Sequence, residues 1–197
     1  HQRVRRQRQM CIRDSPLFVS SVISNLLSIL FLIYVLFRFF ELSFLNPIVK
    51  YSFSILEPFT KPFRLILPVI FKIDLASLAL SIIFKGLSFY LYVESQSLET
   101  NSIESISWSV LSVFLTISLV LRYSLFISII GSWIAPSSNN AFLIICHGIT
   151  QPLLRPFQRF TAMGGIDFSP IIVFFILIQV DRMIHNFRFY LELPGLF

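Results

Sequence analysis

The chain has 197 residues, of which 55% are hydrophobic and only 13% are charged, against about 25% charged residues in an ordinary soluble domain. A water-soluble domain of this size has too little polar surface to cover so many apolar side chains. Composition therefore excludes a soluble protein and predicts an integral membrane protein. The formal net charge of +6 is concentrated at the N-terminus, because residues 1–15 hold five of the sixteen Lys and Arg residues.

Residues 1–15 read HQRVRRQRQMCIRDS and show no helical periodicity of apolar side chains. We expect a disordered basic tail there, which is either foreign to the native protein or a cationic arm near anionic lipid. Nothing in the chain resembles a nucleic-acid-binding module. The two cysteines, Cys11 and Cys146, are too few for a disulfide framework or a metal cluster.

Four stretches are long and apolar enough to span a bilayer, which takes about 20 residues in a helix. They cover about residues 16–40, 75–93, 106–134 and 168–187. The fold class that these spans predict is an all-α membrane protein with four transmembrane helices. The first two spans fall in one half of the chain, residues 16–97, and the last two in the other half, residues 98–197.

The charges between the spans predict an orientation. Basic residues occur between spans one and two and again between spans three and four, whereas the segment between spans two and three holds acidic residues and no Lys or Arg. The positive-inside rule places the two basic segments in the cytoplasm and the acidic segment outside. Both termini are then expected outside.

The two basic segments contain the same motif. Residues 57–63 read EPFTKPF and residues 151–157 read QPLLRPF, and each is followed by an Ile-Asp pair, at 73–74 and at 166–167. The sequence therefore predicts an internal repeat of span, Pro-basic-Pro segment, Ile-Asp and span. Because both halves enter the membrane with the same orientation, we expect parallel two-helix repeats.

These residues resemble the YggT family of small bacterial membrane proteins, which has plastid relatives and carries such a motif twice per chain. The second half is the better match, with Gln151-Pro152-Leu153-Leu154-Arg155-Pro156 and the run MGGIDFSP at 163–170. Two departures stand out: Phe71-Lys72 replaces the glycine pair of the first half, and Gln158 replaces a usual basic residue. The resemblance implies a multi-pass protein of the bacterial inner membrane with no known enzymatic activity. It also implies links to envelope or division-linked organisation, to ion and osmotic homeostasis, and to assembly of plastid membrane complexes.

The paired prolines should lie at the membrane interface. A second proline four residues after the first removes a helical hydrogen bond, and the carbonyl that it frees finds no water in the bilayer core. We expect this segment either to anchor the topology or to contact lipid headgroups or a protein partner. The candidate contact residues are Pro58, Lys61, Pro62, Arg64, Pro152, Arg155, Pro156 and Arg159.

Asp74 and Asp167 each precede a span, where an aspartate can cap the helix N-terminus. The alternative to a helix cap is a salt bridge from either carboxylate to a basic residue of the same repeat.

Three charged residues lie inside the predicted spans. Lys85 is in the middle of the second span, on one stripe with several serines, so it should face the bundle. It either pairs within the bundle or serves ion or proton movement. Arg122 lies deep in the third span, and Asp181 in the fourth span is its expected partner.

No catalytic constellation is present: the sequence has no Gly-x-Ser-x-Gly elbow, Walker loop, HExxH or dinucleotide fingerprint. We therefore expect no enzymatic activity, no cofactor and no metal. The favoured function is a scaffold or assembly factor for membrane or division-linked complexes, with lipids and a cytoplasmic protein as partners. The alternative is a small channel or transporter subunit, which would require a homo-oligomer.

Overall fold

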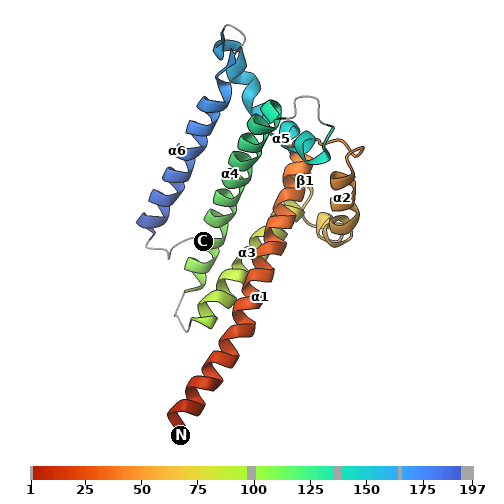
Figure 1. The fold of residues 1–197 in the computed structure, drawn as a ribbon. Helices are drawn as coiled ribbons and strands as arrows, with labels where there is room; N and C mark the ends of the chain where they lie inside the picture. The colour runs from red at the N-terminus through yellow and green to blue at the C-terminus, as the bar shows by residue number, and fades with distance from the viewer. Residues whose placement is uncertain (1, 97–100, 135–138, 164–165, 192–197) are drawn as a thin grey trace.

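The computed structural model describes the backbone of residues 2–96, 101–134, 139–163 and 166–191, and the side chains of 16–96, 101–134, 139–159 and 168–191. Over these ranges the order helix, helix, hairpin, helix occurs twice (Figure 1). The first half consists of α1 (Gln2–Phe39), α2 (Pro47–Thr60), the 3-10 turn η1 (Phe63–Leu65), β1 (Val69–Ile70), β2 (Ile73–Asp74) and α3 (Leu75–Ser95). The second half consists of α4 (Ser102–Ile134), α5 (Ala141–Thr161), β3 (Ala162–Met163), β4 (Ile166–Asp167) and α6 (Ser169–Tyr190).

Four helices are long and apolar enough to cross a membrane: Pro16–Phe39, Leu75–Ser95, Ser102–Ile134 and Ser169–Tyr190. They confirm the four predicted spans, with boundaries that agree to within a few residues. In Figure 1, α1 and α4 run upward along the chain and α3 and α6 run downward. The helices α2 and α5 therefore lie at the upper ends of the spans that they connect.

The N-terminal segment differs from its prediction. α1 begins at Gln2, so the residues expected to form a disordered tail belong to the backbone of a long helix. The segment before Pro16 contains no glycine or proline and is rich in Gln and Arg, which are good helix formers. Once the apolar span supplies a helical nucleus, extending it backward adds one hydrogen bond per residue and needs no new nucleation.

Small side chains bring the spanning helices together. Ser28 of α1 donates a hydrogen bond to the carbonyl of Ser81 of α3 at 2.8 Å, and Ser81 returns one to the carbonyl of Ser28 at 3.0 Å. Gly86 of α3 faces Ser109 of α4 so closely that an added Cβ would lie 3.0 Å from the Ser109 Oγ atom. Small residues at helix contacts allow such close approach, which is how helices pack in lipid, where burial of apolar surface adds little.

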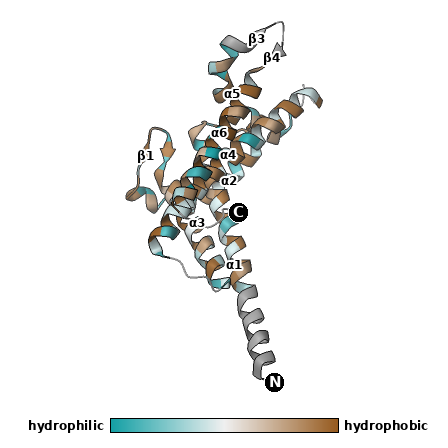
Figure 2. Cartoon of the chain, turned by 90° about the vertical axis from the view of Figure 1, so that its left-hand side faces the viewer, coloured by the Kyte–Doolittle hydropathy of each residue, from teal (hydrophilic) through white to brown (hydrophobic). Residues whose placement is uncertain are grey.

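The two connecting helices share one core. Phe31, Tyr34 and Phe37 of α1 pack with residues of α2, α3 and α5, namely Val49, Phe53, Leu56, Leu80, Ile145 and Ile149. The start of α2 is tied to the start of α5, because the Asn46 side chain caps α2 and donates to the carbonyl of Ala141 at 2.7 Å. This core joins the two halves of the molecule. In Figure 2 the helices are mostly brown, the colour of hydrophobic residues.

The paired prolines affect the two helices differently. α2 contains Pro58 and ends at Thr60, two residues before Pro62. α5 instead continues through both Pro152 and Pro156 to Thr161. Both prolines of α5 lie on its exposed side, where water or headgroups can bond the carbonyls that proline leaves unpaired.

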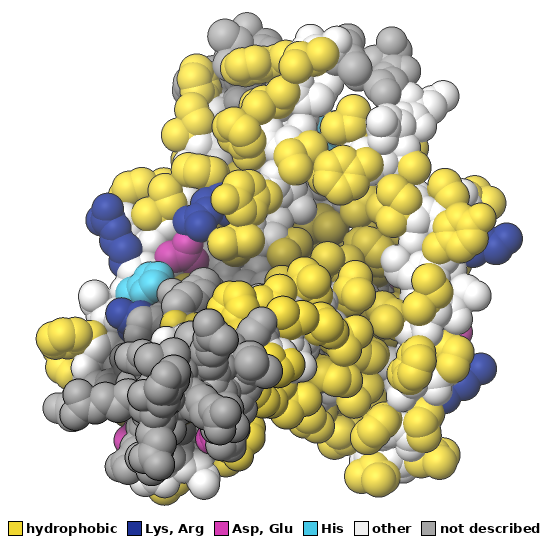
Figure 3. Space-filling model, turned by 60° about the horizontal axis from the view of Figure 1, so that its bottom comes forward, with side chains coloured by type: hydrophobic (Ala, Val, Ile, Leu, Met, Phe, Trp, Pro, Cys, Tyr) yellow, Lys and Arg dark blue, Asp and Glu magenta, His cyan; other side chains and the backbone are white. Residues whose placement is uncertain are grey.

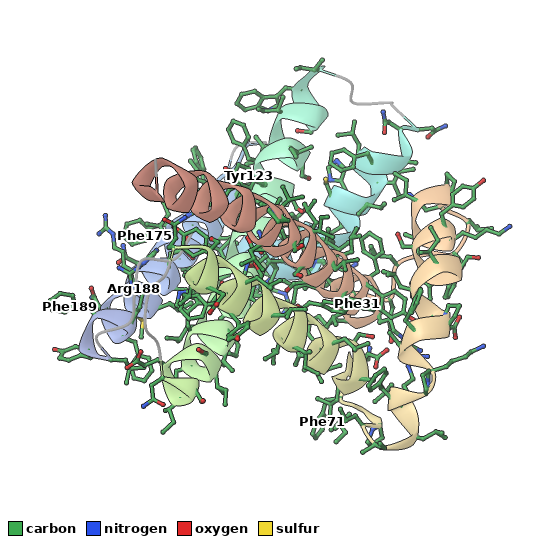
Figure 4. All side chains as sticks on the ribbon, turned by 90° about the horizontal axis from the view of Figure 1, so that it is seen from below. Phe31, Phe71, Tyr123, Phe175, Arg188 and Phe189 are labelled. Carbon is green, nitrogen blue, oxygen red and sulfur yellow. The ribbon has the colours of Figure 1, made fainter. Side chains whose placement is uncertain are left out.

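The hairpin β1–β2 turns through Phe71 and Lys72, with Val69 opposite Asp74 and Ile70 opposite Ile73. Both turn residues have positive φ, 48° and 70°, which is the backbone that a two-residue hairpin of type I′ requires and that glycine adopts most easily. The side chain of Phe71 projects outward at the edge of the molecule (Figure 4). The second hairpin, β3–β4, has the same register, but its Gly164-Gly165 pair lies outside the described residues.

The exterior of the spanning helices is apolar. Viewed from below, hydrophobic side chains cover most of the visible face, and the charged ones lie near its margins (Figure 3). Phe175 on α6, for example, is 61% exposed. Extended apolar surfaces of this kind mark contact with lipid or with other apolar partners.

Candidate functional site

A buried carboxylate joins three elements of the first half. Asp74, in β2, is fully buried and accepts hydrogen bonds on Oδ2 from Arg38 Nη1 at 2.9 Å and from Arg64 Nη2 at 2.6 Å. Arg38 lies at the end of α1, and Arg64 lies in η1. Arg64 Nη2 also donates to the Tyr34 hydroxyl at 2.7 Å. We call these four residues, Tyr34, Arg38, Arg64 and Asp74, the first-half ion cluster.

The cluster fixes the charge of its members. Burial by itself would raise the pKa of Asp74, but hydrogen bonds from Arg64, Ser77 and Arg38 outweigh it and lower the pKa below its usual value. Burial likewise opposes the charged form of Arg64, yet its bonds to Asp74 and Tyr34 raise the pKa of Arg64. The Asp74 carboxylate and the Arg64 guanidinium group therefore stay charged at neutral pH. Glu57 Oε1 also lies 3.6 Å from Arg64 Nη1, so two guanidinium groups face two carboxylates and their formal charges balance.

Asp74 takes both roles that the sequence suggested for it. It is the N-cap residue of α3, with the Ser77 amide donating to Oδ1 at 3.4 Å, and it is salt-linked within its own half of the chain. In the second half the N-cap of α6 is Phe168, so the cap predicted at Asp167 falls one residue later. The side chain of Asp167 lies outside the described residues.

Arg64 corrects one prediction, because its side chain points inward to Asp74 and not outward to lipid phosphates. Arg38, which is not among the candidate site residues named from the sequence, is a full member of the cluster. The available signal was its position in the sequence. Arg38 lies at the end of the first span and Asp74 directly precedes the second, so both residues are expected on the same side of the membrane.

The second half has a cavity where the first half has its ion cluster. Residues 94 positions apart align, as Pro58 and Pro152 do, so Ser128, Ser132 and Gln158 stand in the places of Tyr34, Arg38 and Arg64. A cavity of about 490 Å³ is present there, lined by Ser128, Ile129, Ser132, Trp133, His147, Thr150, Gln151, Leu154, Gln158 and Pro170. Two of the lining residues, Ser132 and Gln158, are uncharged and stand where the first half has guanidinium groups.

One polar network crosses this second-half cavity. His147 Nδ1 and Ser128 Oγ lie 2.8 Å apart. Thr150 Oγ1 lies 3.4 Å from Ser128 Oγ and donates to the Cys146 carbonyl at 2.8 Å. The described residues thus link α4 to α5 through Ser128, His147 and Thr150, in the place where the first half has its ion cluster.

The remaining basic residues of the two motifs are exposed. Lys61, Arg155 and Arg159 form no ion pair with a carboxylate that the structure describes. Arg155 and Arg159 border a shallow hollow together with Pro156 and Gln158. Pro58 and Pro62 are exposed beside Lys61, so the motif presents its prolines and its free cations on the same surface.

Lys85 lies in α3, only 5% exposed, and its Nζ donates to Asn25 Oδ1 at 2.7 Å and to Thr116 Oγ1 at 3.5 Å. The prediction that it faces the bundle is correct. Its partners were not foreseen, although Asn25 is an isolated amide in an otherwise apolar span and such residues commonly bond across helices in membranes.

Arg122 of α4 and Asp181 of α6 form the predicted ion pair. The other carboxylate oxygen of Asp181, Oδ1, is buried and has no hydrogen-bond partner among the described groups. The ion pair with Arg122 thus stabilises the charge of Asp181 inside a span.

Comparison with known proteins agrees with these features. The sequence model of the CCB3/YggT family matches residues 15–93 and again residues 105–187, one match in each half. The chain is 32% identical to PA0392 of Pseudomonas aeruginosa over 178 residues, which cover 89% of this chain and 90% of that protein. It is 31% identical to a protein of Haemophilus influenzae, over 88% of this chain and 92% of that protein. It is 29% identical to YggT of Escherichia coli K12, over 83% of this chain and 86% of that protein.

The names of these three relatives assign no activity to them. No solved structure matches the chain significantly. The two family matches cover the two halves in which the structure repeats its order of elements. The chain belongs to the CCB3/YggT family, and each of its halves carries one copy of the family's repeat.

Proposed function

We propose that this chain is a non-enzymatic protein of the bacterial inner membrane that acts as a scaffold or assembly factor for membrane or division-linked complexes. The observation that carries the proposal is the free basic charge of both Pro-basic-Pro motifs. Lys61, Arg155 and Arg159 are exposed and have no described acidic partner, so they remain available to lipid headgroups or to a protein. We call these three residues the exposed basic triad.

The arrangement that we propose is a pair of parallel two-helix repeats. It is supported by the directions of the four spanning helices in Figure 1 and by the charges of the connecting segments. Both motifs then face the cytoplasm, where anionic lipids attract basic residues near the surface by about 1 kcal/mol each.

Apolar side chains next to Lys61 suit an interfacial position. Phe59 is 61% exposed and Leu65 is 90% exposed, so both are free to enter the acyl boundary while the ammonium group stays at phosphate level. Arg64 is not part of this contact surface, because the ion cluster holds its side chain. The proposed contact surface therefore comprises the exposed basic triad and the neighbouring prolines.

The test replaces Lys61, Arg155 and Arg159 together by Gln and compares co-purification from native membranes. We expect the amount of co-purified protein or anionic lipid to be at least about tenfold lower than with the wild type, since three interfacial charges are lost. Insertion of the protein into the membrane should persist. The matched control replaces Lys50, Lys72 and Arg182 by Gln, which removes the same charge from exposed positions outside the motifs. Equal co-purification by the two variants would contradict the proposal.

A second candidate function is a small channel or transporter subunit, which the burial of Lys85 inside a span favours. Ion flux into liposomes that depends on Lys85, and that disappears in Lys85→Leu, is the expected result under this candidate. Flux no greater than in empty liposomes would remove it. The candidate also requires a homo-oligomer, since four helices enclose only a narrow path.

A further inference from the structure

A second cavity lies between α1, α3 and α4, toward the end of the spans opposite α2 and α5. Its volume is about 380 Å³, within the range of small-molecule sites. It is lined by Phe18, Ser21, Val22, Asn25, Lys85, Ser88, Phe89, Tyr92 and Trp108. We call it the Lys85 cavity.

The Lys85 cavity contains buried donors for which the described residues provide no anionic acceptor. The Lys85 ammonium group has three N–H donors, and the partners that the structure gives it, Asn25 and Thr116, are neutral. Trp108 is 3% exposed, and its Nε1 donor has no hydrogen-bond partner among the described groups. A cationic donor and an unpaired indole donor that line the same cavity are suited to a negatively charged acceptor.

The rest of the lining is apolar and aromatic. Phe89 stacks on Trp108 with ring centroids 4.3 Å apart and an interplanar angle of 21°. Phe18 and Val22 are 48% and 43% exposed, so they belong to the outer face of α1 and mark the mouth of the cavity. The occupant must therefore combine an acceptor head with an apolar body.

We propose that the Lys85 cavity binds an organic monocarboxylate with an apolar body. The carboxylate accepts hydrogen bonds from Lys85 Nζ and Trp108 Nε1, and the apolar body packs against Phe18, Val22 and Phe89. A single negative charge matches the single cation, whereas a dianion would leave an excess charge buried in an apolar region. The ligand is either a water-borne aromatic acid or a fatty acid from the bilayer, since both share this chemistry.

This site goes beyond the scaffold role and does not depend on it. Loss of co-purification through the exposed basic triad and loss of carboxylate binding through Lys85 are separate measurements on separate ends of the molecule. Binding of a carboxylate without flux through liposomes would support a ligand site and would remove the transport candidate.

Tryptophan fluorescence can report occupancy directly. Replacing the exposed Trp133 by Phe leaves Trp108 as the single tryptophan, and bromine on a bound ligand quenches a neighbouring indole. The full chain in lipid nanodiscs is titrated with 4-bromobenzoate and, separately, with 9,10-dibromostearate. The neutral counterparts, 4-bromobenzamide and the brominated fatty alcohol, serve as ligand controls.

We expect saturable quenching by at least one carboxylate, with the dissociation constant raised about tenfold or more by Lys85→Met, as loss of a charge-assisted hydrogen bond implies. Lys85→Arg should retain binding. Lys72→Met, which removes an exposed lysine, is the matched control and should change nothing. Quenching by bromobenzoate alone identifies a water-borne ligand, and quenching by dibromostearate alone identifies a lipid.

Three results would overturn the proposal: no quenching by either acid, equal quenching by the neutral counterparts, or unchanged binding in Lys85→Met. If Lys85→Met fails to elute as a folded protein in gel filtration, Ser88→Leu replaces it. That variant fills the cavity next to Lys85 without altering a charge, and it should abolish quenching as well. Unchanged quenching in Ser88→Leu would place the ligand outside the cavity.

Discussion

At the scale of single residues, neighbouring basic side chains of the first half lie in different environments. Lys61 and Arg64 are three residues apart in the first motif, yet Lys61 is exposed and Arg64 is bound to Asp74. The cause is the burial of Asp74, whose carboxylate would be costly inside the protein without charged partners. Arg64 and Arg38 are therefore structural residues, and Lys61 is free for contacts outside the chain.

The ion cluster leads to a stability prediction. Asp74→Ala removes the buried carboxylate that Arg38 and Arg64 share and leaves Arg64 with only the partly exposed Glu57 at 3.6 Å. It should lower the free energy of unfolding by about 3 kcal/mol. Thermal unfolding in detergent micelles, followed by circular dichroism, measures the loss. The control is Glu41→Gln, which breaks the exposed pair of Glu41 and Lys72, 66% and 61% exposed, and should cost less than about 1 kcal/mol. Equal losses would show that the cluster is no more than a surface contact.

The pH dependence of stability follows from the lowered pKa of Asp74. Because the folded state holds this carboxylate more acidic than the unfolded chain does, its contribution is fully present above the unfolded value of about 3.9 and is lost as the pH falls through the lower folded value. Asp74→Asn should therefore flatten the acid limb of a stability profile recorded from pH 7 to pH 2. A profile parallel to the wild type would contradict this assignment.

At the scale of elements, each repeat uses a hairpin to return the chain to its second span. In the first half, the hairpin turn is made by Phe71 and Lys72 with positive φ, although neither residue favours that backbone. Such a turn explains why a glycine pair suits this position, as the sequence of the second half has at 164–165. The hairpin persists here because the pairing of β1 with β2 and the bonds of Asp74 hold both of its ends.

Relieving this turn should stabilise the protein. Asn tolerates the left-handed region better than other non-glycine residues, so Phe71→Asn should be more stable than Phe71→Ala by about 0.5–1 kcal/mol. Both variants remove the same exposed ring, which makes Ala the matched control. Thermal unfolding together with hydrogen exchange of residues 69–74 tests the difference. Equal stability would mean that the turn carries no backbone strain.

The contact of α6 with α4 includes one ion pair inside the spans. Arg122→Leu or Asp181→Leu alone leaves an unpaired charge among apolar side chains and should each cost about 3 kcal/mol. The double variant should recover at least about 2 kcal/mol, a coupling that a double-mutant cycle on unfolding free energies measures. Arg182→Leu, at the exposed neighbouring position, is the control. Additive losses would mean that the pair contributes nothing to helix docking.

At the scale of the whole molecule, the parallel arrangement predicts which segments share a side of the membrane. In a chain with Cys11 and Cys146 replaced by Ser, single cysteines at Lys61 and at Arg155 should react with an impermeant maleimide only after cells are opened. A cysteine at Asn101, in the acidic connection, should react from outside. Labelling of Lys61 and Arg155 from opposite sides would exclude parallel repeats.

The sequence by itself determined the four spans, the repeat and the family, because these depend on composition, on periodic apolar runs and on motifs that can be counted along the chain. It also predicted the pairs of charged residues that chemistry demands, such as Arg122 with Asp181. Only the tertiary structure decided which basic residues turn inward and where cavities remain. Those outcomes depend on which side chains from distant segments come into contact. Asp74 forms ion pairs with Arg38 and Arg64, whereas Ser132 and Gln158 line a cavity at the corresponding place in the second half.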